Sequence, residues 1–292
     1  MKALLAVLLI CMFVTVDAKT IISYRPPSAD EDVRDQYFID LLTLILERTR
    51  DEFGDYELTF SRDIIVQSRA AALIAANDRI NILWSMTSPK NEQMLRPIRI
   101  PLQKGLLGLR IFIVRKPDSQ KFANIENIYQ LKRFKAGQGH DWPDTEILRT
   151  SGLPVVTSPS YQSLFKMLSE RRFDYFPRGV VEPYEEVASH PDMNLTVEPS
   201  ILLSYRAPIY FFVSKDNEEL ATRLETGLQA AIDDGSFDEF FYNHPQIKRF
   251  LEEANLTERK RFVIKNPLLT PETKKILDEP KYWYPYPESW PE

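Results

Sequence analysis

The chain has 292 residues, of which 43% are hydrophobic, and it carries a formal net charge of -5 at pH 7. This composition is sufficient for the core of a globular protein. The acidic balance argues against nucleic acid as a partner, because proteins that bind it present a basic face. Cys11 is the only cysteine, which excludes an intramolecular disulfide framework and a cysteine-based zinc site.

Residues 1–18 have the layout of a secretory signal peptide. Lys2 is followed by an unbroken apolar run over 3–16, and Val16 and Ala18 are small residues at the positions that a signal peptidase reads. The run is shorter than the roughly 20 apolar residues that span a bilayer. We therefore expect cleavage after Ala18 and export to the periplasm, with an uncleaved membrane anchor as the alternative.

Beyond this segment, predicted strands and helices alternate. Apolar residues at helical spacing predict a helix over 35–50, and an Ala-rich stretch predicts another over 67–76. Strands are predicted at 20–24, 56–60, 80–84 and 106–114. The order β-α-β-α-β implies a sheet with parallel crossovers.

A second series of the same kind begins near residue 131. The predicted strands are 131–137, 154–156, 173–176, 195–198 and 209–213, and the predicted helices are 145–150, 159–171, 184–188 and 218–233. Gly235 follows the last helix, as a C-terminal cap does. Two successive α/β units without a Gly/Ser linker predict two packed lobes.

Four short motifs follow one another along these elements. They are TSPK at 87–90, RRFDY at 171–175, the strand 209–213 followed by SKDN, and DGSF at 234–237. In this order they resemble the T-x-x-R turn, the G-R-x-D-A strand entry, the return crossover and the closing helix of type II periplasmic solute-binding proteins. The subgroup they resemble is solute-binding family 3, the amino-acid-binding type.

The resemblance implies an α/β fold of two lobes with two hinge crossovers, which close over a ligand by a hinge motion. The division that follows is a signal peptide at 1–18, lobe 1 at 19–112 plus 209–250, lobe 2 at 113–208, and a C-terminal aromatic and proline-rich extension at 251–292. The hinge strands are expected near 111–114 and 205–212.

The chain departs from this family at the α-amino-acid clamp. The family's turn carries an arginine that pairs bidentately with the ligand carboxylate, whereas the matching residues here are Lys90, Asn91 and Glu92. The family's aspartate for the ligand ammonium is replaced by Gly179. We therefore do not expect an amino-acid receptor.

In lobe 2, the turn after strand 131–137 predicts ligand contacts. Backbone N–H groups at a helix start favour an anion, and glycines let a ligand approach. Gln138, Gly139 and His140 are the predicted contacts, with Trp142 as a wall. The alternative is a tight turn whose tryptophan packs into the core and whose Asp141 or Asp144 caps the helix.

Two further residues of lobe 2 are candidates. Arg178 ends a predicted strand, where it could pair with a ligand carboxylate or phosphate; its alternative is a salt bridge with Glu182, Glu185 or Glu186. Tyr161 begins a helix and faces the cleft, or staples that helix.

In lobe 1, the candidates follow strands, because open α/β sheets bind ligands beyond the carboxyl ends of their strands. They are Tyr24, Arg25, Trp84 and Thr87. The alternative for Trp84 is a buried core aromatic.

No metal, cofactor or catalytic residue is predicted. His140, His190 and His244 lie in separate segments without metal-ligand spacing, and no dinucleotide or P-loop fingerprint occurs. The aromatic, proline-rich tail over 281–291 is expected to wrap along a lobe, with docking to a membrane partner as the alternative.

Together these features predict an exported, monomeric solute-binding protein that closes over a small polar, anionic ligand. Its partner would be an inner-membrane permease or a sensor receptor. The alternative is an enzyme on the same scaffold, a lyase or dehydratase acting on a small carboxylic acid, with His140 and Asp141, or Glu182, as acid and base.

Overall fold

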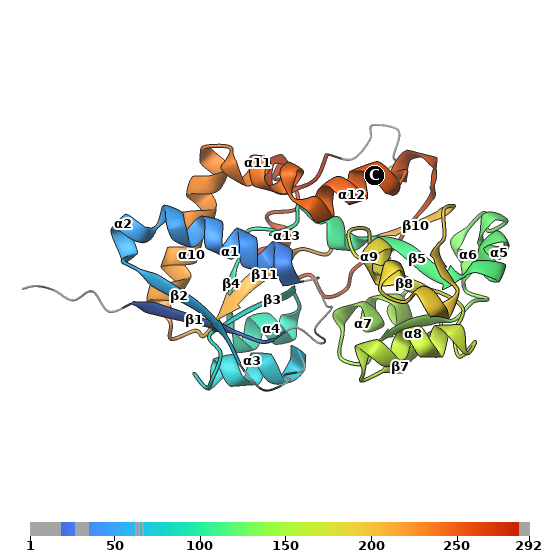
Figure 1. Ribbon diagram of the computed structural model, residues 1–292, viewed down its shortest axis with the longest axis horizontal. Helices are drawn as coiled ribbons and strands as arrows, with labels where there is room; N and C mark the ends of the chain where they lie inside the picture. Colours follow the sequence, from blue (N-terminus) through green and yellow to red (C-terminus); the bar gives the residue numbers. More distant parts are fainter. Residues whose placement is uncertain (1–18, 27–34, 62, 64, 66, 286–292) are drawn as a thin grey trace, which may run out of the picture.

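The computed structural model describes residues 19–26, 35–61, 63, 65 and 67–285. The predicted signal peptide and the last residues of the tail lie outside this part of the chain. Within the described part, no helix has both the length and the apolar character that a membrane span requires. Figure 1 shows two lobes side by side, with helices α11 (Ser236–Asn243) and α12 (Pro245–Glu253) running along one edge above them.

Lobe 1 contains two small sheets. Strand β1 (Thr20–Tyr24) pairs in parallel with β2 (Tyr56–Phe60), and β11 (Ile209–Val213) lies antiparallel between β3 (Ile82–Met86) and β4 (Arg96–Ile98). The helices of this lobe are α1 (Gln36–Arg48), α2 (Arg50–Phe53), α3 (Gln67–Ala75), α4 (Pro89–Met94) and α10 (Glu218–Asp233).

Helix α10 packs directly on α1, and one glycine allows this. A Cβ atom at Gly227 would lie 2.6 Å from the carbonyl oxygen of Ile45, which is closer than real atoms approach. Any larger residue at 227 would force the two helices apart. The apolar face that α1 buries in this way includes Leu41, Leu42 and Leu46.

Lobe 2 is built around a five-stranded sheet. Its order is β12 (Lys260–Val263), β10 (Ile201–Ser204), β5 (Leu109–Arg115) and β8 (Phe176–Gly179), and β9 (Leu195–Val197) also pairs with β5. Strands β6 (Ala136–Gly139) and β7 (Val155–Ser158) form a parallel pair. The helices are α5 (Ser119–Ala123), α6 (Ile128–Leu131), α7 (Pro143–Thr150), α8 (Tyr161–Ser169) and α9 (Pro183–Ala188).

Several predicted bounds are wrong. The predicted strand 131–137 starts too early: Leu131 ends α6, which Asn127 caps through its side chain, residues 132–135 form a turn, and β6 begins at Ala136. The predicted strand 173–176 is β8, which begins at Phe176. Parallel crossovers occur in β1–β2 and β6–β7, whereas β11 returns antiparallel.

Two segments connect the lobes, at 103–108 and 205–208, and they lie against each other. The backbone N–H of Tyr205 donates to the carbonyl oxygen of Gly108 (2.9 Å). A Cβ atom at Gly108 would lie 1.9 Å from the carbonyl oxygen of Tyr205, so only glycine permits this approach. These two hinge segments form one side of the space between the lobes.

Candidate functional site

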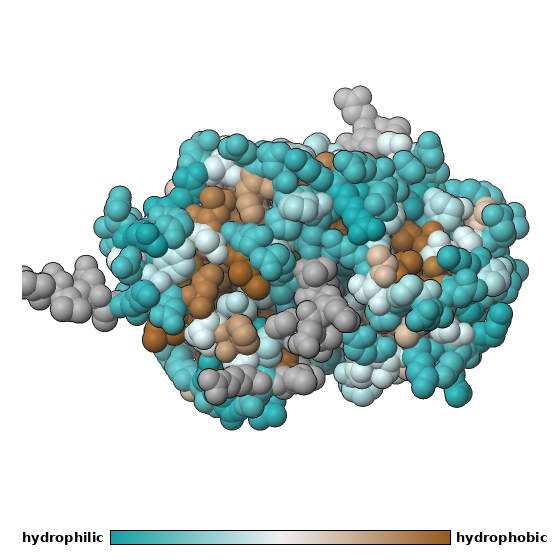
Figure 2. All heavy atoms as spheres, viewed as in Figure 1, coloured by the Kyte–Doolittle hydropathy of each residue, from teal (hydrophilic) through white to brown (hydrophobic). Residues whose placement is uncertain are grey.

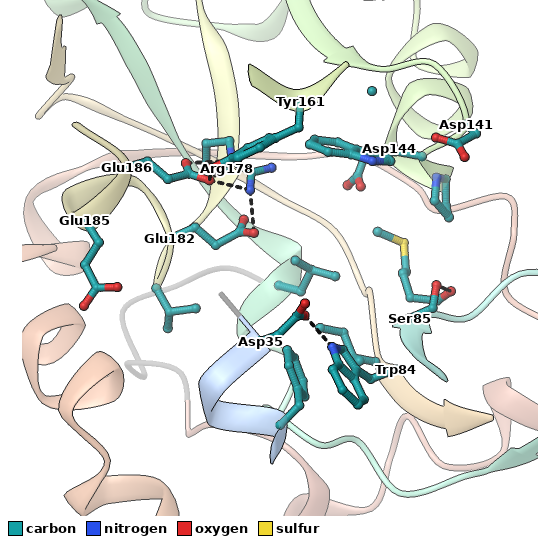
Figure 3. A pocket seen from close by; sticks show the side chains of 18 of the residues that line it. Asp35, Trp84, Ser85, Asp141, Asp144, Tyr161, Arg178, Glu182, Glu185 and Glu186 are labelled. Atoms are coloured by element: carbon teal, nitrogen blue, oxygen red, sulfur yellow. Dashed lines mark hydrogen bonds and ion pairs between the residues drawn. The ribbon is translucent and has the colours of Figure 1, made fainter. Parts of the chain in front are cut away.

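A pocket of about 460 Å³ lies between the lobes and against the hinge. It is lined from lobe 1 by Arg25, Asp35, Phe38, Trp84 and Ile209, at the hinge by Gln103, Leu107 and Arg110, and from lobe 2 by Gly139, Asp141, Trp142, Asp144, Tyr161, Arg178, Glu182, Glu185 and Glu186, among others. Figure 3 shows Asp35 and Trp84 of lobe 1 on one side of the pocket and Arg178, Glu182 and Asp144 of lobe 2 on the other.

Arg178 is the centre of the lobe 2 wall. Its Nε donates to both carboxylate oxygens of Glu186 (2.8 and 3.0 Å) and its Nη2 donates to Glu182 (2.6 Å). The guanidinium lies 5.0 Å from the ring centroid of Trp142 and 4.9 Å from that of Phe176. Only 2% of the residue is exposed.

These neighbours keep Arg178 charged. Burial alone lowers the pKa of a guanidinium, but the carboxylates of Glu182 and Glu186 outweigh it and raise the pKa of Arg178 above its usual value. The turn that enters α9 sets this geometry, since the backbone N–H of Gly179 donates to Glu182 (2.6 Å). Tyr161 adds a hydroxyl that donates to Glu186 (2.7 Å).

A second buried ion pair lies at the hinge. Arg110 of β5 is 1% exposed and pairs with Asp144, which also accepts from the hydroxyl of Tyr205. Glu182 is 3.8 Å from Arg110 and so joins the two clusters. Asp144 stands in the first turn of α7, where a carboxylate is favourable for the helix dipole. The helix start therefore presents a negative side chain to the pocket.

The lobe 1 wall is more apolar. The indole N–H of Trp84 donates to Asp35 (2.6 Å), and its ring stacks on Phe38 with centroids 5.8 Å apart. Arg25 lies 3.6 Å from the same carboxylate. Tyr24 packs behind Trp84 at 5.5 Å between centroids. This wall thus offers an aromatic surface with one acidic and one basic group.

The structure brings six of the ten predicted ligand contacts into the pocket lining. They are Arg25, Trp84, Gly139, Trp142, Tyr161 and Arg178. Whether each contacts a ligand stays a prediction. For Arg178, the geometry is that of its stated alternative, a salt bridge with Glu182 and Glu186.

The other four lie elsewhere. Tyr24 is behind Trp84, and Thr87 is fully buried with its hydroxyl donating to Glu92 (2.5 Å). Gln138 is buried and donates to the carbonyl oxygen of Pro177 (3.2 Å). His140 lines a second cavity of about 570 Å³, which shares the turn 141–143 with the first.

Two charged residues of the lining, Asp35 and Arg110, were not predicted in any role. Five others were named only as helix caps, ion-pair partners or acid–base groups and not as ligand contacts: Asp141, Asp144, Glu182, Glu185 and Glu186. Arg110 had a signal in the sequence, because it is the one charged residue within the apolar run 106–114. Such a residue in a buried strand needs a buried partner. Asp35 and Glu185 had no comparable signal, since acidic residues at helix starts are common on surfaces.

The lining carries more negative than positive charge. Six of its residues are acidic (Asp35, Asp141, Asp144, Glu182, Glu185 and Glu186) and three are arginines (Arg25, Arg110 and Arg178), a formal difference of -3. Across the described part of the chain, no group of His, Cys, Asp and Glu is arranged to hold a metal ion.

The sequence matches no known family model, and no curated protein is similar to it in sequence. Solved structures do match. An ancestral arginine-binding protein bound to glutamine has 15% identity, covers 78% of this chain and 98% of its own, and has a TM-score of 0.57. An arginine-specific periplasmic binding protein from Salmonella typhimurium has 15% identity, covers 76% and 97%, and has a TM-score of 0.57.

A histidine kinase sensor domain with similarity to periplasmic binding proteins also matches. It has 16% identity, covers 76% of this chain and 93% of its own, and has a TM-score of 0.54. At these identities the likeness establishes the fold. The matches confirm the predicted two-lobe α/β fold and its resemblance to amino-acid-binding periplasmic proteins.

Proposed function

We propose that this chain is an exported solute-binding protein whose lobes close over a small polar ligand in the pocket between them. The observation that carries the proposal is the position of the pocket, which is lined from both lobes and the hinge of a fold that arginine-binding proteins share. The periplasm is its expected location. The role is transport through a permease or sensing through a membrane receptor, since similar structures include a periplasmic binding protein and a kinase sensor domain.

We also propose that the ligand carries positive charge, opposite to the sign predicted from the sequence. The sequence favoured an anionic ligand on the condition that Arg25, Arg178 and a helix start all face the cleft. All three line it, but Arg178 is neutralised by two carboxylates and α7 begins with Asp144. An excess of three acidic groups in a cleft with low-dielectric walls attracts cations.

The test is a thermal-shift and calorimetric comparison of three probes with the same five-carbon chain: 1,5-diaminopentane, glutarate and 1,5-pentanediol. We expect stabilisation by the diamine alone, because only this probe is cationic. A ligand that binds only the folded state stabilises it by about 2.7 kcal/mol at a hundredfold excess over Kd. Stabilisation by glutarate would contradict the proposed positive charge of the ligand but would support solute binding. No shift with these probes or with a broad metabolite panel would contradict solute binding.

A variant tests the site directly. Glu185 lines the pocket, and within the described residues its carboxylate has no ion-pair partner. Glu185→Gln should therefore weaken diamine binding without exposing a buried charge. Glu170→Gln, at an exposed position of lobe 2, is the matched control and should bind as the wild type does.

We propose binding rather than the enzyme alternative. His140 and Asp141 lie together in the second cavity, but only Asp141 also lines the pocket between the lobes. Glu182 lies in that pocket and is bound to Arg178 and to the backbone N–H of Gly179. The acid and base of one reaction must both reach the same substrate, and no such pair singles out the pocket between the lobes.

A further inference from the structure

The C-terminal strap, defined here as residues 254–284, first joins lobe 2. Its strand β12 pairs in parallel with β10, from Ile201 opposite Lys260 to Ser204 opposite Val263. Arg259 is buried at its start and donates to the carbonyl oxygen of Ile201 (3.2 Å). The strap thus contributes one strand to the lobe 2 sheet.

The same segment contributes to the lobe 2 core and then crosses to lobe 1. Phe262 and Leu268 are buried in the cluster that contains Phe112 and Tyr175 of lobe 2. Ile276 packs instead against the lobe 1 cluster that contains Phe212. The strap therefore packs apolar side chains against the cores of both lobes, and removing this apolar surface from water stabilises both contacts.

In lobe 1 the strap is anchored on Glu92 of α4. Thr270 and Thr273, which flank the start of α13 (Pro271–Lys274), donate their hydroxyls to its carboxylate (3.0 and 2.9 Å). Burial raises the pKa of Glu92, but these hydroxyls, with Thr87 and Arg99, outweigh it and hold the pKa below its usual value. The carboxylate therefore stays charged and keeps the anchor at neutral pH.

One ring then contacts both hinge segments. Trp283 lies so close to Gly105 that a Cβ atom there would be 2.5 Å from the indole, and Arg206 of the other hinge segment lies 5.0 Å over the same ring. The backbone N–H of Tyr284 donates to Lys104 (2.8 Å). Asn266 donates to the carbonyl oxygen of Arg206 (2.7 Å).

From these contacts we infer that the strap is a third connection between the lobes and that it limits how far they open, with Trp283 as its pivot. A hinge of two segments opens when a few residues change φ and ψ. Here both segments are held by one buried ring, and the strap is fixed to a strand on one lobe and to a carboxylate on the other. The inference concerns the ligand-free protein and holds whatever the ligand proves to be.

The experiment measures the lobe-to-lobe distance without ligand. Spin labels are placed on Glu57→Cys in β2 and Glu170→Cys after α8, in a Cys11→Ser background, because Cys11 is the only native cysteine. We expect a narrow distance distribution by pulsed double electron–electron resonance. Trp283→Ala should broaden it by roughly a factor of two, since the two hinge segments regain their backbone freedom. The control Tyr129→Ala removes an exposed ring of lobe 2 and should change nothing.

An unchanged distribution in Trp283→Ala that retains the wild-type circular dichroism would overturn the inference. If that variant does not fold, the pair Arg206→Ala and Asn266→Ala decides by the same criterion, because Asn266 of the strap donates to the backbone of Arg206 and the exposed Arg206 side chain lies over Trp283, so the pair removes contacts between the strap and one hinge segment. A broader distance distribution in these two variants would support the inference that the strap limits opening, and an unchanged distribution would contradict it. None of these measurements depends on solute binding.

Discussion

The two walls of the pocket differ in chemistry: the lobe 2 wall is charged and the lobe 1 wall is mainly aromatic. On lobe 2, Arg178 is surrounded by two carboxylates and three aromatic rings and is almost fully buried. On lobe 1, Trp84 and Phe38 form a stacked surface, and among the described lobe 1 residues that line the pocket only Asp35 is acidic. On the face shown in Figure 2, hydrophilic side chains cover both lobes and apolar patches lie on each, so this division is not visible there. The charged side chains of the lobe 2 wall are held in place by ion pairs in the ligand-free protein, whereas the lobe 1 wall provides mainly apolar contact area.

The largest expected effect is on the charged wall. Arg178→Met leaves Glu182 and Glu186 buried without their cation, so it should lower the free energy of unfolding by about 3–5 kcal/mol. Denaturant titration measures this. Arg25→Gln on the other wall is the matched comparison, because its pairing with Asp35 is long at 3.6 Å and should contribute below about 1 kcal/mol. Equal effects of the two substitutions would mean that the walls do not differ in this way.

A smaller effect is expected on the aromatic wall. Trp84→Phe keeps a ring against Phe38 but removes the indole N–H that donates to Asp35. A hydrogen bond to a charged group contributes about 1.5–3 kcal/mol, and denaturant titration of the two proteins gives the difference. Phe38→Leu is the control for ring packing alone. A loss of stability only in the control would assign the role of Trp84 to packing.

The smallest effect concerns a carboxylate of lobe 1 outside the pocket. The pKa of Glu92 is lowered in the folded protein, so its stabilising contribution is present above its ordinary value of 4.5 and is lost as pH falls through the lower folded-state value. Thr273→Val removes one of its donors and should reduce the loss of stability between neutral and acidic pH. Melting temperatures at several pH values measure this, and parallel pH curves for wild type and variant would contradict it.

The sequence predicted site residues correctly where a general rule of α/β folds places them. Arg25, Trp84 and Arg178 follow or end predicted strands, and the rule that ligands lie beyond strand ends sufficed to expect them around one pocket, although Trp84 lies in the middle of β3. Whether Arg178 is paired or available to a ligand depends on where the start of α9 places Glu182. The backbone N–H of Gly179 donates to Glu182 and holds this carboxylate in place. The local sequence pattern does not predict this hydrogen bond.

The C-terminal extension shows the same limit. Its aromatic tail over 281–291 was expected to bury its rings along a lobe, and of the described tail residues Trp283 is buried and Tyr284 packs against Phe241 and Phe250. The preceding part of the extension contacts the cores of both lobes, which the sequence did not predict. Strand β12 is only four residues long and has two basic residues at its start. Its partner β10 lies about sixty positions earlier in the chain. Pairing at such a separation is a property of the folded chain rather than of a local window.

Strand β12 also bears on the order in which the protein folds. The sheet of lobe 2 is encoded mostly by the middle of the chain, yet its edge is completed by a strand near the end. Contacts between distant segments form slowly, because the loop between them must first be closed. The middle of the chain therefore finishes folding after the end has been synthesised. Under the proposed export in an unfolded state, this delay is favourable, because the sheet of lobe 2 is incomplete until β12 is available to pair with β10.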